Sequence, residues 1–234
     1  MYKIIFACVV SALVAAALIA YGGRDVPAAH FPGRLAETSI VNPITIEEDP
    51  YRNGTDPPGD HTMKSAVCGF RFADVSRKRY SIRTFRDEAD AARSGYAVTH
   101  RGYCGTCSTL KDLAVYLERR DMTYAVRSCS FRMTRCGILS CLGSMGFTGP
   151  CALTWYYNIR NTARHCLGTC LLSWMKREPL NRADGSLNDC IRCDEDRSGP
   201  IFKYYAGRTR RNSGIKSEIG RDPKEIYRVI HDYR

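Results

Sequence analysis

The chain has 234 residues, and 44% of them are hydrophobic. This length suits one domain with a hydrophobic core and argues against two full domains. The formal net charge is +11, and such a surplus favours anionic partners over cationic ones.

Residues 4–20 form an uncharged apolar run between Lys3 and Arg24. The run is long for a signal-peptide core and short for a membrane span. We therefore predict that residues 1–23 are a signal peptide or a membrane anchor, and the sequence leaves both open. Either one places the rest of the chain outside the cytoplasm: secreted, periplasmic or in the lumen of the secretory pathway. A retained anchor would add a membrane contact through residues 4–20.

The chain contains 12 cysteines, and one of them, Cys8, lies in the apolar run. In an oxidising compartment the others are expected to form disulfides, because such bridges restrict the unfolded chain. Their number is odd, so at least one cysteine of a monomer is left without a partner. Such a thiol is either reactive, paired with another molecule, or buried and inert.

Residues 24–62 are rich in proline and lack apolar periodicity, so an irregular arm is predicted there. Residues 63–234 are expected to form a disulfide-stabilised domain with a basic C-terminal segment. The predicted fold class is α+β: a single disulfide-rich domain with a helical hairpin and a small sheet.

The first half of this domain carries most of the strand signals. Strands are predicted at 66–72, 80–85 and 96–99, where β-branched and aromatic residues gather, and a further strand at 124–127. Helices are predicted at 87–94 and along the apolar stripe from Leu110 to Leu117.

Two cysteine-bearing helices, over 132–142 and 152–172, are predicted to form the hairpin, because glycines and Pro150 turn the chain between them. Antiparallel packing of these helices predicts two disulfides: Cys136 with Cys170, and Cys141 with Cys166. This pairing is a hypothesis, since spacing alone does not fix connectivity.

The segment His100–Ser108 is the main candidate for chemistry. It runs from an expected strand end to an expected helix start and contains Cys104 and Cys107. A cysteine at a helix N-terminus faces unpaired N–H groups and the positive end of the helix dipole, which favour the reactive thiolate. Cys107 is therefore the candidate nucleophile.

The stretch Gly102-Tyr103-Cys104-Gly105-Thr106-Cys107 resembles the nucleophile loop of papain-like cysteine proteases. In that family the first cysteine of the loop is bridged and the second attacks, so the resemblance implies the same roles for Cys104 and Cys107. It departs from the family at Ser108, where an aromatic residue is usual, and at Arg101, where the family has its oxyanion-hole glutamine.

His100 and His165 are the candidate general bases for such a nucleophile. Asn161 lies one turn before His165 on a predicted helix and is a candidate to orient an imidazole. The alternative is that the histidines are ordinary surface or core residues and that the asparagine caps local backbone.

The basic C-terminal segment is the candidate site for an anionic part of a substrate. Its candidate ligands are Ser198, Lys203, Arg208, Arg210 and Arg211. Arginine offers paired donors to carboxylate, sulfate or phosphate. The alternative is a solvated basic loop whose arginines pair with Asp194 and Glu195.

Two Cys-x-x-Cys pairs, at 104/107 and 190/193, allow a zinc site or, at the first pair, thiol–disulfide exchange. Export and the long gap between the pairs argue against zinc, so no metal ligand is assigned and no cofactor is expected. The chain lacks a thioredoxin-like βαβ order, which places exchange below the nucleophile hypothesis.

Three functions remain open. The first is a cysteine-dependent hydrolase or acyl transferase that acts on an anionic substrate. The second is a non-catalytic, disulfide-stapled binding module for an acidic partner, and the third is a thiol–disulfide oxidoreductase that uses Cys104 and Cys107. The expected partners are an anionic small molecule or an acidic protein or peptide, whereas nucleic acid is not expected for an exported chain. The redox state of Cys107 decides between these functions.

Overall fold

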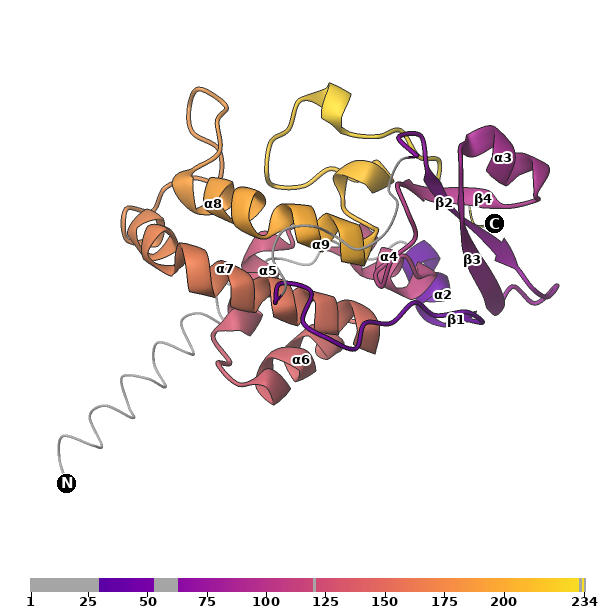
Figure 1. The fold of residues 1–234 in the computed structure, drawn as a ribbon, viewed down its shortest axis with the longest axis horizontal. Helices are drawn as coiled ribbons and strands as arrows, with labels where there is room; N and C mark the ends of the chain where they lie inside the picture. The colour runs from indigo at the N-terminus through magenta and orange to yellow at the C-terminus, as the bar shows by residue number, and fades with distance from the viewer. Residues whose placement is uncertain (1–29, 53–62, 120, 232, 234) are drawn as a thin grey trace.

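A computed structural model describes residues 30–52, 63–119, 121–231 and 233. The expected signal peptide or anchor, residues 1–23, lies outside the described residues. Figure 1 shows a small sheet at one end of the long axis of the molecule and the ends of two packed helices at the other. The structure is a single disulfide-rich α+β domain, which confirms the predicted fold class.

The described sheet is mixed and has the strand order β1-β3-β2-β4. Its strands are β1 (Ser39–Ile40), β2 (Val67–Phe72), β3 (Arg79–Phe85) and β4 (Ala97–Arg101). β2 runs antiparallel to both β3 and β4, whereas β1 pairs with β3 in parallel. The three strands predicted at 66–72, 80–85 and 96–99 are confirmed as β2, β3 and β4.

The two faces of the sheet bury different residues, because successive side chains of a strand alternate. Cys68 and Phe70 of β2 pack with Tyr80 and Ile82 of β3 in one core cluster, together with residues of α4 (Leu110–Glu118). Val67 and Phe85 point to the other face and pack against α3 (Glu88–Arg93). The helices predicted at these two places are confirmed.

The second half of the domain is helical. Its elements are α5 (Thr123–Ser130), α6 (Arg135–Ser144), α7 (Gly149–Met175), α8 (Asp189–Arg197), α9 (Gly199–Ala206) and the 3-10 turns η1 (Arg211–Ser213) and η2 (Pro223–Glu225). The predicted hairpin is confirmed as α6 and α7. The 27-residue helix α7 also packs against α8 and α9, so it is the central element of this half.

The prediction of a strand at 124–127 is wrong, because these residues belong to α5. The Asp121 carboxylate accepts hydrogen bonds from the backbone N–H groups of Thr123 and Tyr124 and so starts a helix there. Val126 and Cys129, three residues apart, are both buried in the helical core. Helical spacing thus buries one face of a segment whose composition suits a strand.

Five disulfides join cysteines of the described residues. They are Cys68–Cys104, Cys107–Cys151, Cys129–Cys141, Cys166–Cys193 and Cys170–Cys190. The pairing predicted within the hairpin is wrong: α6 is bridged to α5, and α7 is bridged to α8. Cys136 lies exposed at the start of α6 and is the free cysteine among the described residues. This number of bridges indicates an oxidising, extracytoplasmic environment.

The described part of the predicted arm, residues 30–52, packs on the domain and has regular structure at 30–36 and 39–40, whereas residues 41–52 form no helix or strand. It contains α2 (His30–Ala36) and β1, and Leu35 is buried in the core beside α4. The Asn42 side chain donates to Ile82 O over 2.7 Å and accepts from Ile82 N over 3.0 Å. The folded domain thus includes residues before position 63. Among the described helices, none is long and apolar enough to cross a membrane.

Candidate functional site

The loop between β4 and α4 has the predicted position, but Cys107 is not a free thiol. Cys107 forms a disulfide with Cys151 in the first turn of α7, and its side chain is fully buried. The attacking species of a cysteine nucleophile is the thiolate, which a bridged sulfur does not provide. The assignment of Cys107 as nucleophile is corrected on this ground.

The backbone amides of this loop are occupied as well. Thr106 N and Cys107 N donate to the carbonyl oxygens of Tyr205 and Ala206 at the end of α9, each over 2.9 Å. They are therefore not available to stabilise a thiolate or an oxyanion. Gly105 packs so closely against α9 that a Cβ at its position would clash with the Tyr205 carbonyl oxygen. The loop joins the start of α4 to the end of α9.

Neither Cys-x-x-Cys pair is a dithiol in this structure. The cysteines of the first pair are bridged to Cys68 and Cys151, and those of the second pair to Cys170 and Cys166. Disulfide exchange needs a dithiol, and zinc binding needs thiolates. Neither a dithiol nor a thiolate is present here, because each sulfur is bonded to a different partner. The oxidoreductase and zinc alternatives are corrected for this reason.

His100 lies in β4 and is fully buried. Its Nδ1 is 2.8 Å from Arg101 O, a carbonyl that only accepts, so Nδ1 carries the proton and Nε2 is the acceptor. Burial lowers the pKa of His100 well below its ordinary value of 6.5, and the charge of Arg208 lowers it further. The imidazole is therefore neutral and has a fixed tautomer.

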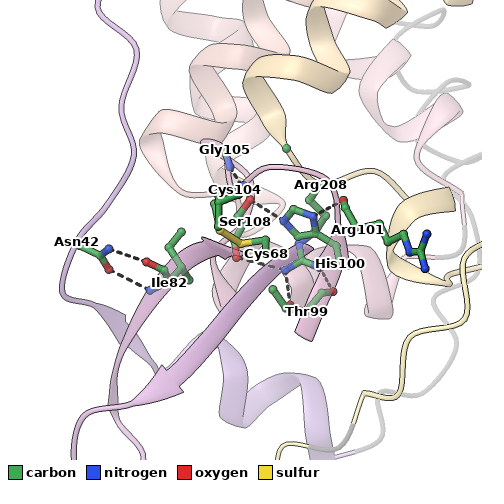
Figure 2. Close-up of a disulfide and its surroundings, with 12 residues drawn as sticks. Asn42, Cys68, Ile82, Thr99, His100, Arg101, Cys104, Gly105, Ser108 and Arg208 are labelled. Carbon is green, nitrogen blue, oxygen red and sulfur yellow. Dashed lines mark hydrogen bonds between the residues drawn. A yellow bond between two sulfur atoms is a disulfide. The ribbon is translucent and has the colours of Figure 1, made fainter. Parts of the chain in front are cut away.

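Ser108 is the partner of His100, and sequence reasoning did not assign it a role. Its hydroxyl lies 2.7 Å from His100 Nε2 and accepts a hydrogen bond from Gly105 N, also over 2.7 Å (Figure 2). Serine and histidine in this arrangement resemble the first two members of a nucleophile system. Both side chains have 0% exposure, however, so a substrate has no access to the hydroxyl. The pair therefore holds the loop in place.

Arg208 was predicted to bind an anionic substrate, but it is fully buried and binds the protein's own backbone. Its guanidinium donates to the carbonyl oxygens of Thr99, Cys107 and Ser108 over 3.0 to 3.2 Å. It also donates to the hydroxyls of Thr99 and Ser213. Figure 2 shows Arg208 next to His100 beneath the loop. Its assignment as a substrate ligand is corrected, because no donor faces solvent.

Three other predicted site residues also have structural partners. Arg210 donates to the carbonyl oxygens of Tyr116 and Arg119 and thus caps the C-terminal end of α4. Ser198 has 0% exposure, and its hydroxyl accepts from the Asn161 amide over 3.0 Å. Asn161 also donates to Arg197 O, so this amide joins α7 to the end of α8 and does not orient an imidazole.

His165 is exposed on α7 and lies far from the loop. It follows Cys151 by 14 residues on one continuous helix. At a rise of 1.5 Å per residue, that spacing is about 21 Å along the helix axis. His165 therefore cannot act as a base on any group next to Cys107. The structure does not bring the four predicted catalytic residues together.

Lys203 and Arg211, by contrast, both line a pocket on the surface. The other residues that line it are Thr209, Asn212, Glu225 and Tyr227. Lys203 comes from α9 and Arg211 from η1, whereas Glu225 comes from η2. The volume of the pocket is about 250 Å³. This is slightly below the roughly 300 to 1,000 Å³ of sites for drug-sized ligands, so a small group fits it best.

The two cations that line this pocket, Lys203 and Arg211, share the carboxylate of Glu195 on α8 with Arg221 outside the lining. Glu195 lies 2.9 Å from Arg211, 2.7 Å from Arg221 and 3.8 Å from Lys203. Burial lowers the pKa of Lys203, and the charges of Arg211 and Arg221 lower it further, against the opposing effect of Glu195. Glu195 therefore neutralises part of the positive charge of these three cations.

Glu225 of η2 supplies a second carboxylate. Its Oε2 lies 3.3 Å from Arg211 Nη1, and its side chain is 52% exposed. An ion pair this exposed is weak, because water and salt screen it. A carboxylate from another molecule therefore competes with Glu225 for Arg211 at low cost.

An aromatic wall completes the pocket. Tyr227 is stacked against Arg101, whose guanidinium carbon lies 3.2 Å from the ring centroid. Arg101 O accepts from both His100 Nδ1 and Asn212 Nδ2, so the pocket rests directly on the buried His100–Ser108 pair. Sequence reasoning missed Thr209, Asn212, Glu225 and Tyr227. For Thr209 and Asn212, the dense run of polar residues at 207–214 was a sequence feature that could have indicated them.

A family model matches the C-terminal part of the chain. Residues 136–229 match the model of a family of unknown function (DUF8771). The match starts in α6 and includes every residue that lines the pocket, whereas the described sheet and the loop 100–108 lie outside it. No curated protein and no solved structure matches the chain. Residues 136–229, which include the pocket, are thus similar to a family of unknown function.

Proposed function

We propose that the protein is a non-catalytic, disulfide-stapled binding module and that its pocket binds a carboxylate of an acidic partner. The observation that carries this proposal is the ion pair between Arg211 and Glu225. In it, the chain's own carboxylate lies 3.3 Å from a pocket guanidinium. A ligand with the same group makes the same contact once Glu225 moves aside.

The charges around the pocket support an anionic ligand. Lys203, Arg211 and Arg221 share Glu195, and the formal charge of the whole chain is +11. The overall charge attracts anions to the surface without selecting among them, whereas a guanidinium offers paired donors of fixed geometry. Selectivity for a carboxylate would thus come from Arg211, and Lys203 would add a mobile point charge.

The inaccessibility of the candidate catalytic side chains supports binding over catalysis. Cys107 is bridged, and the His100–Ser108 pair has no exposed surface. The pocket itself is lined by cations, an amide, a hydroxyl and a tyrosine ring, and its two nearby acids are both in ion pairs. A recognition site needs only such groups, whereas a nucleophile also needs an accessible base.

The test is a calorimetric titration of the full chain with two probes, hexaglutamate and free glutarate, at low salt. Lys203→Met keeps most of the side-chain volume and removes one charge, and we expect the affinity to fall by about three- to tenfold. Glu225→Gln frees Arg211, so the affinity should rise. Lys216→Met is the matched control, because Lys216 is exposed in the same segment but does not line the pocket.

Equal losses of affinity in Lys203→Met and Lys216→Met would contradict the proposal, since they would show attraction to the overall charge. The two probes also separate the two sources of a carboxylate. Binding of hexaglutamate alone indicates an acidic protein or peptide, and binding of glutarate with similar affinity indicates a free small acid.

A further inference from the structure

The last turns of α7 expose an apolar surface of unusual density. Leu167 is 57% exposed, Leu171 46%, Trp174 60% and Met175 72%. They follow the spacing i, i+4, i+7 and i+8, which places them on one face of the helix. We call these four residues the α7 stripe. Scattered apolar residues are ordinary on a surface, but a contiguous stripe indicates a contact.

The other face of the same turns is fixed to the domain. Cys166 and Cys170 are bridged to Cys193 and Cys190 of α8, and Ser173 is buried on the same side. Two disulfides within five residues of α7 prevent the helix from rotating to bury the stripe. The stripe is therefore a permanent feature of the folded domain.

Positive charge adjoins the stripe. Arg160 and Arg164 lie seven and three residues before Leu167, on the same helical face, and both are exposed. Lys176 and Arg177 follow directly after Met175 and are exposed as well. The 27 residues of α7 include no aspartate or glutamate. A second copy of this chain would bring the same charges together, so charge complementarity favours an anionic surface.

The position of the stripe suits a flat surface. The C-terminal turns of α7 lie at the end of the molecule away from the sheet (Figure 1). An apolar helical face with tryptophan and flanking arginine and lysine is the composition of helices that lie in the interface of a membrane.

We propose that the α7 stripe docks on an anionic lipid bilayer, with its apolar side chains among the acyl chains and its basic residues on the headgroups. This contact is independent of the carboxylate pocket and of the apolar run at residues 4–20. It holds the helical end of the domain against the membrane.

Trp174 gives a readout that belongs to this surface alone. The chain has two tryptophans, and the other, Trp155, packs against Phe147 and Phe202 in the helical core. The experiment measures quenching of tryptophan fluorescence in the full chain by vesicles with brominated acyl chains. One set of vesicles contains phosphatidylcholine with phosphatidylserine, and the other contains phosphatidylcholine alone. Trp174→Phe removes the signal and shows the contribution of Trp155.

We expect strong quenching on the anionic vesicles and little on the neutral ones. Leu171→Ser should lower the partition onto vesicles by about tenfold, and Val75→Ser, a fully exposed apolar residue near the sheet, should leave it unchanged. Arg164→Gln should lower it by about fivefold and the control Lys78→Gln by less than twofold.

Two results would overturn the proposal. If the chain sediments with vesicles while Trp174 stays unquenched, the membrane contact is made elsewhere, as by residues 4–20. If hexaglutamate protects Trp174 from acrylamide and anionic vesicles do not, the stripe binds an acidic protein. The variants should stay folded, because every substituted side chain is exposed, so misfolding does not obscure either result.

Discussion

The Nε2 atom of His100 accepts a hydrogen bond from the hydroxyl of Ser108 over 2.7 Å, inside the segment that suggests a cysteine nucleophile. The residue next to the expected nucleophile is thus the one that contacts the histidine, while Cys107 is bridged to Cys151. Because this pair has 0% exposure, its effect is on the stability of the loop and of the pocket above it.

Ser108→Ala should lower the free energy of unfolding by about 2 to 6 kcal/mol. The substitution leaves His100 Nε2 and Gly105 N–H buried without a partner, and each such group costs roughly 1 to 3 kcal/mol. Urea unfolding measures the loss. Ser128→Ala is the control, because Ser128 is exposed and bonds only to Ala125 O in its own helix. A loss no larger than that of the control would show that the pair is not structural.

The contribution of His100 to the stability of the domain should fall as the pH drops below about 6.5. The pKa of His100 is well below 6.5 when folded, so in this range the unfolded chain takes up a proton that the folded chain does not. The slope for one such group reaches at most about 1.4 kcal/mol per pH unit. His231, whose pKa burial also lowers, adds an effect of the same sign.

Asp112 has the opposite effect, because burial raises its pKa to about 6 and the folded chain then binds the extra proton. The contribution of His100 is therefore measured as the difference between wild type and His100→Asn in urea unfolding at pH 7.5, 6.5 and 5.5. The variant should be less stable and should have the shallower slope. Parallel curves would show that His100 titrates normally in the folded chain.

Local patterns predicted the elements that depend on local order. The β-branched and aromatic residues of 66–72 and 80–85 form strands because they also alternate between the two faces of a sheet. Residues 124–127 have similar composition, but the Asp121 carboxylate accepts from backbone N–H groups at the start of a helix, and Cys129 is bridged to Cys141. Both constraints lie outside these four residues. A four-residue signal cannot contain them.

The partners of the cysteines and arginines depend on tertiary contacts and were mostly missed. Arg208 resembles a ligand-binding arginine in sequence, and its burial follows only from the carbonyls of Thr99 and Cys107, about a hundred residues earlier. Lys203 and Arg211 carry the same sequence signal and do line a pocket. Charge pattern thus located the basic segment, and the fold decided which of its cations face solvent.

Thiol mapping should find Cys107 protected. Under non-reducing conditions, we expect iodoacetamide to modify Cys136 among the cysteines from 68 to 193, because Cys136 is exposed and unbridged. Peptide mapping should recover Cys107 linked to Cys151. Cys136→Ser removes the labelling and serves as the control. Modification of Cys107 in the folded protein would restore the nucleophile hypothesis and contradict this structure.

Arg208→Lys should destabilise the domain by about 3 to 5 kcal/mol, although it conserves the charge. Arg208 donates to five acceptors on three segments of the chain, and their positions match the fork of a guanidinium. A lysine ammonium has three donors at one point, so it leaves some of these buried acceptors unpaired and keeps a buried charge.

Arg208→Met removes the charge together with the donors and separates these two effects. If the desolvated charge dominates, the methionine variant should be more stable than the lysine variant, and if the lost donors dominate, the order should reverse. The control is Arg192→Lys on α8, an exposed arginine that bonds to Leu187 O, for which we expect a change within about 0.5 kcal/mol. Thermal and urea unfolding of the four proteins measures both comparisons. A lysine variant as stable as wild type would show that the fork geometry of Arg208 does not hold β4, the loop and η1 together.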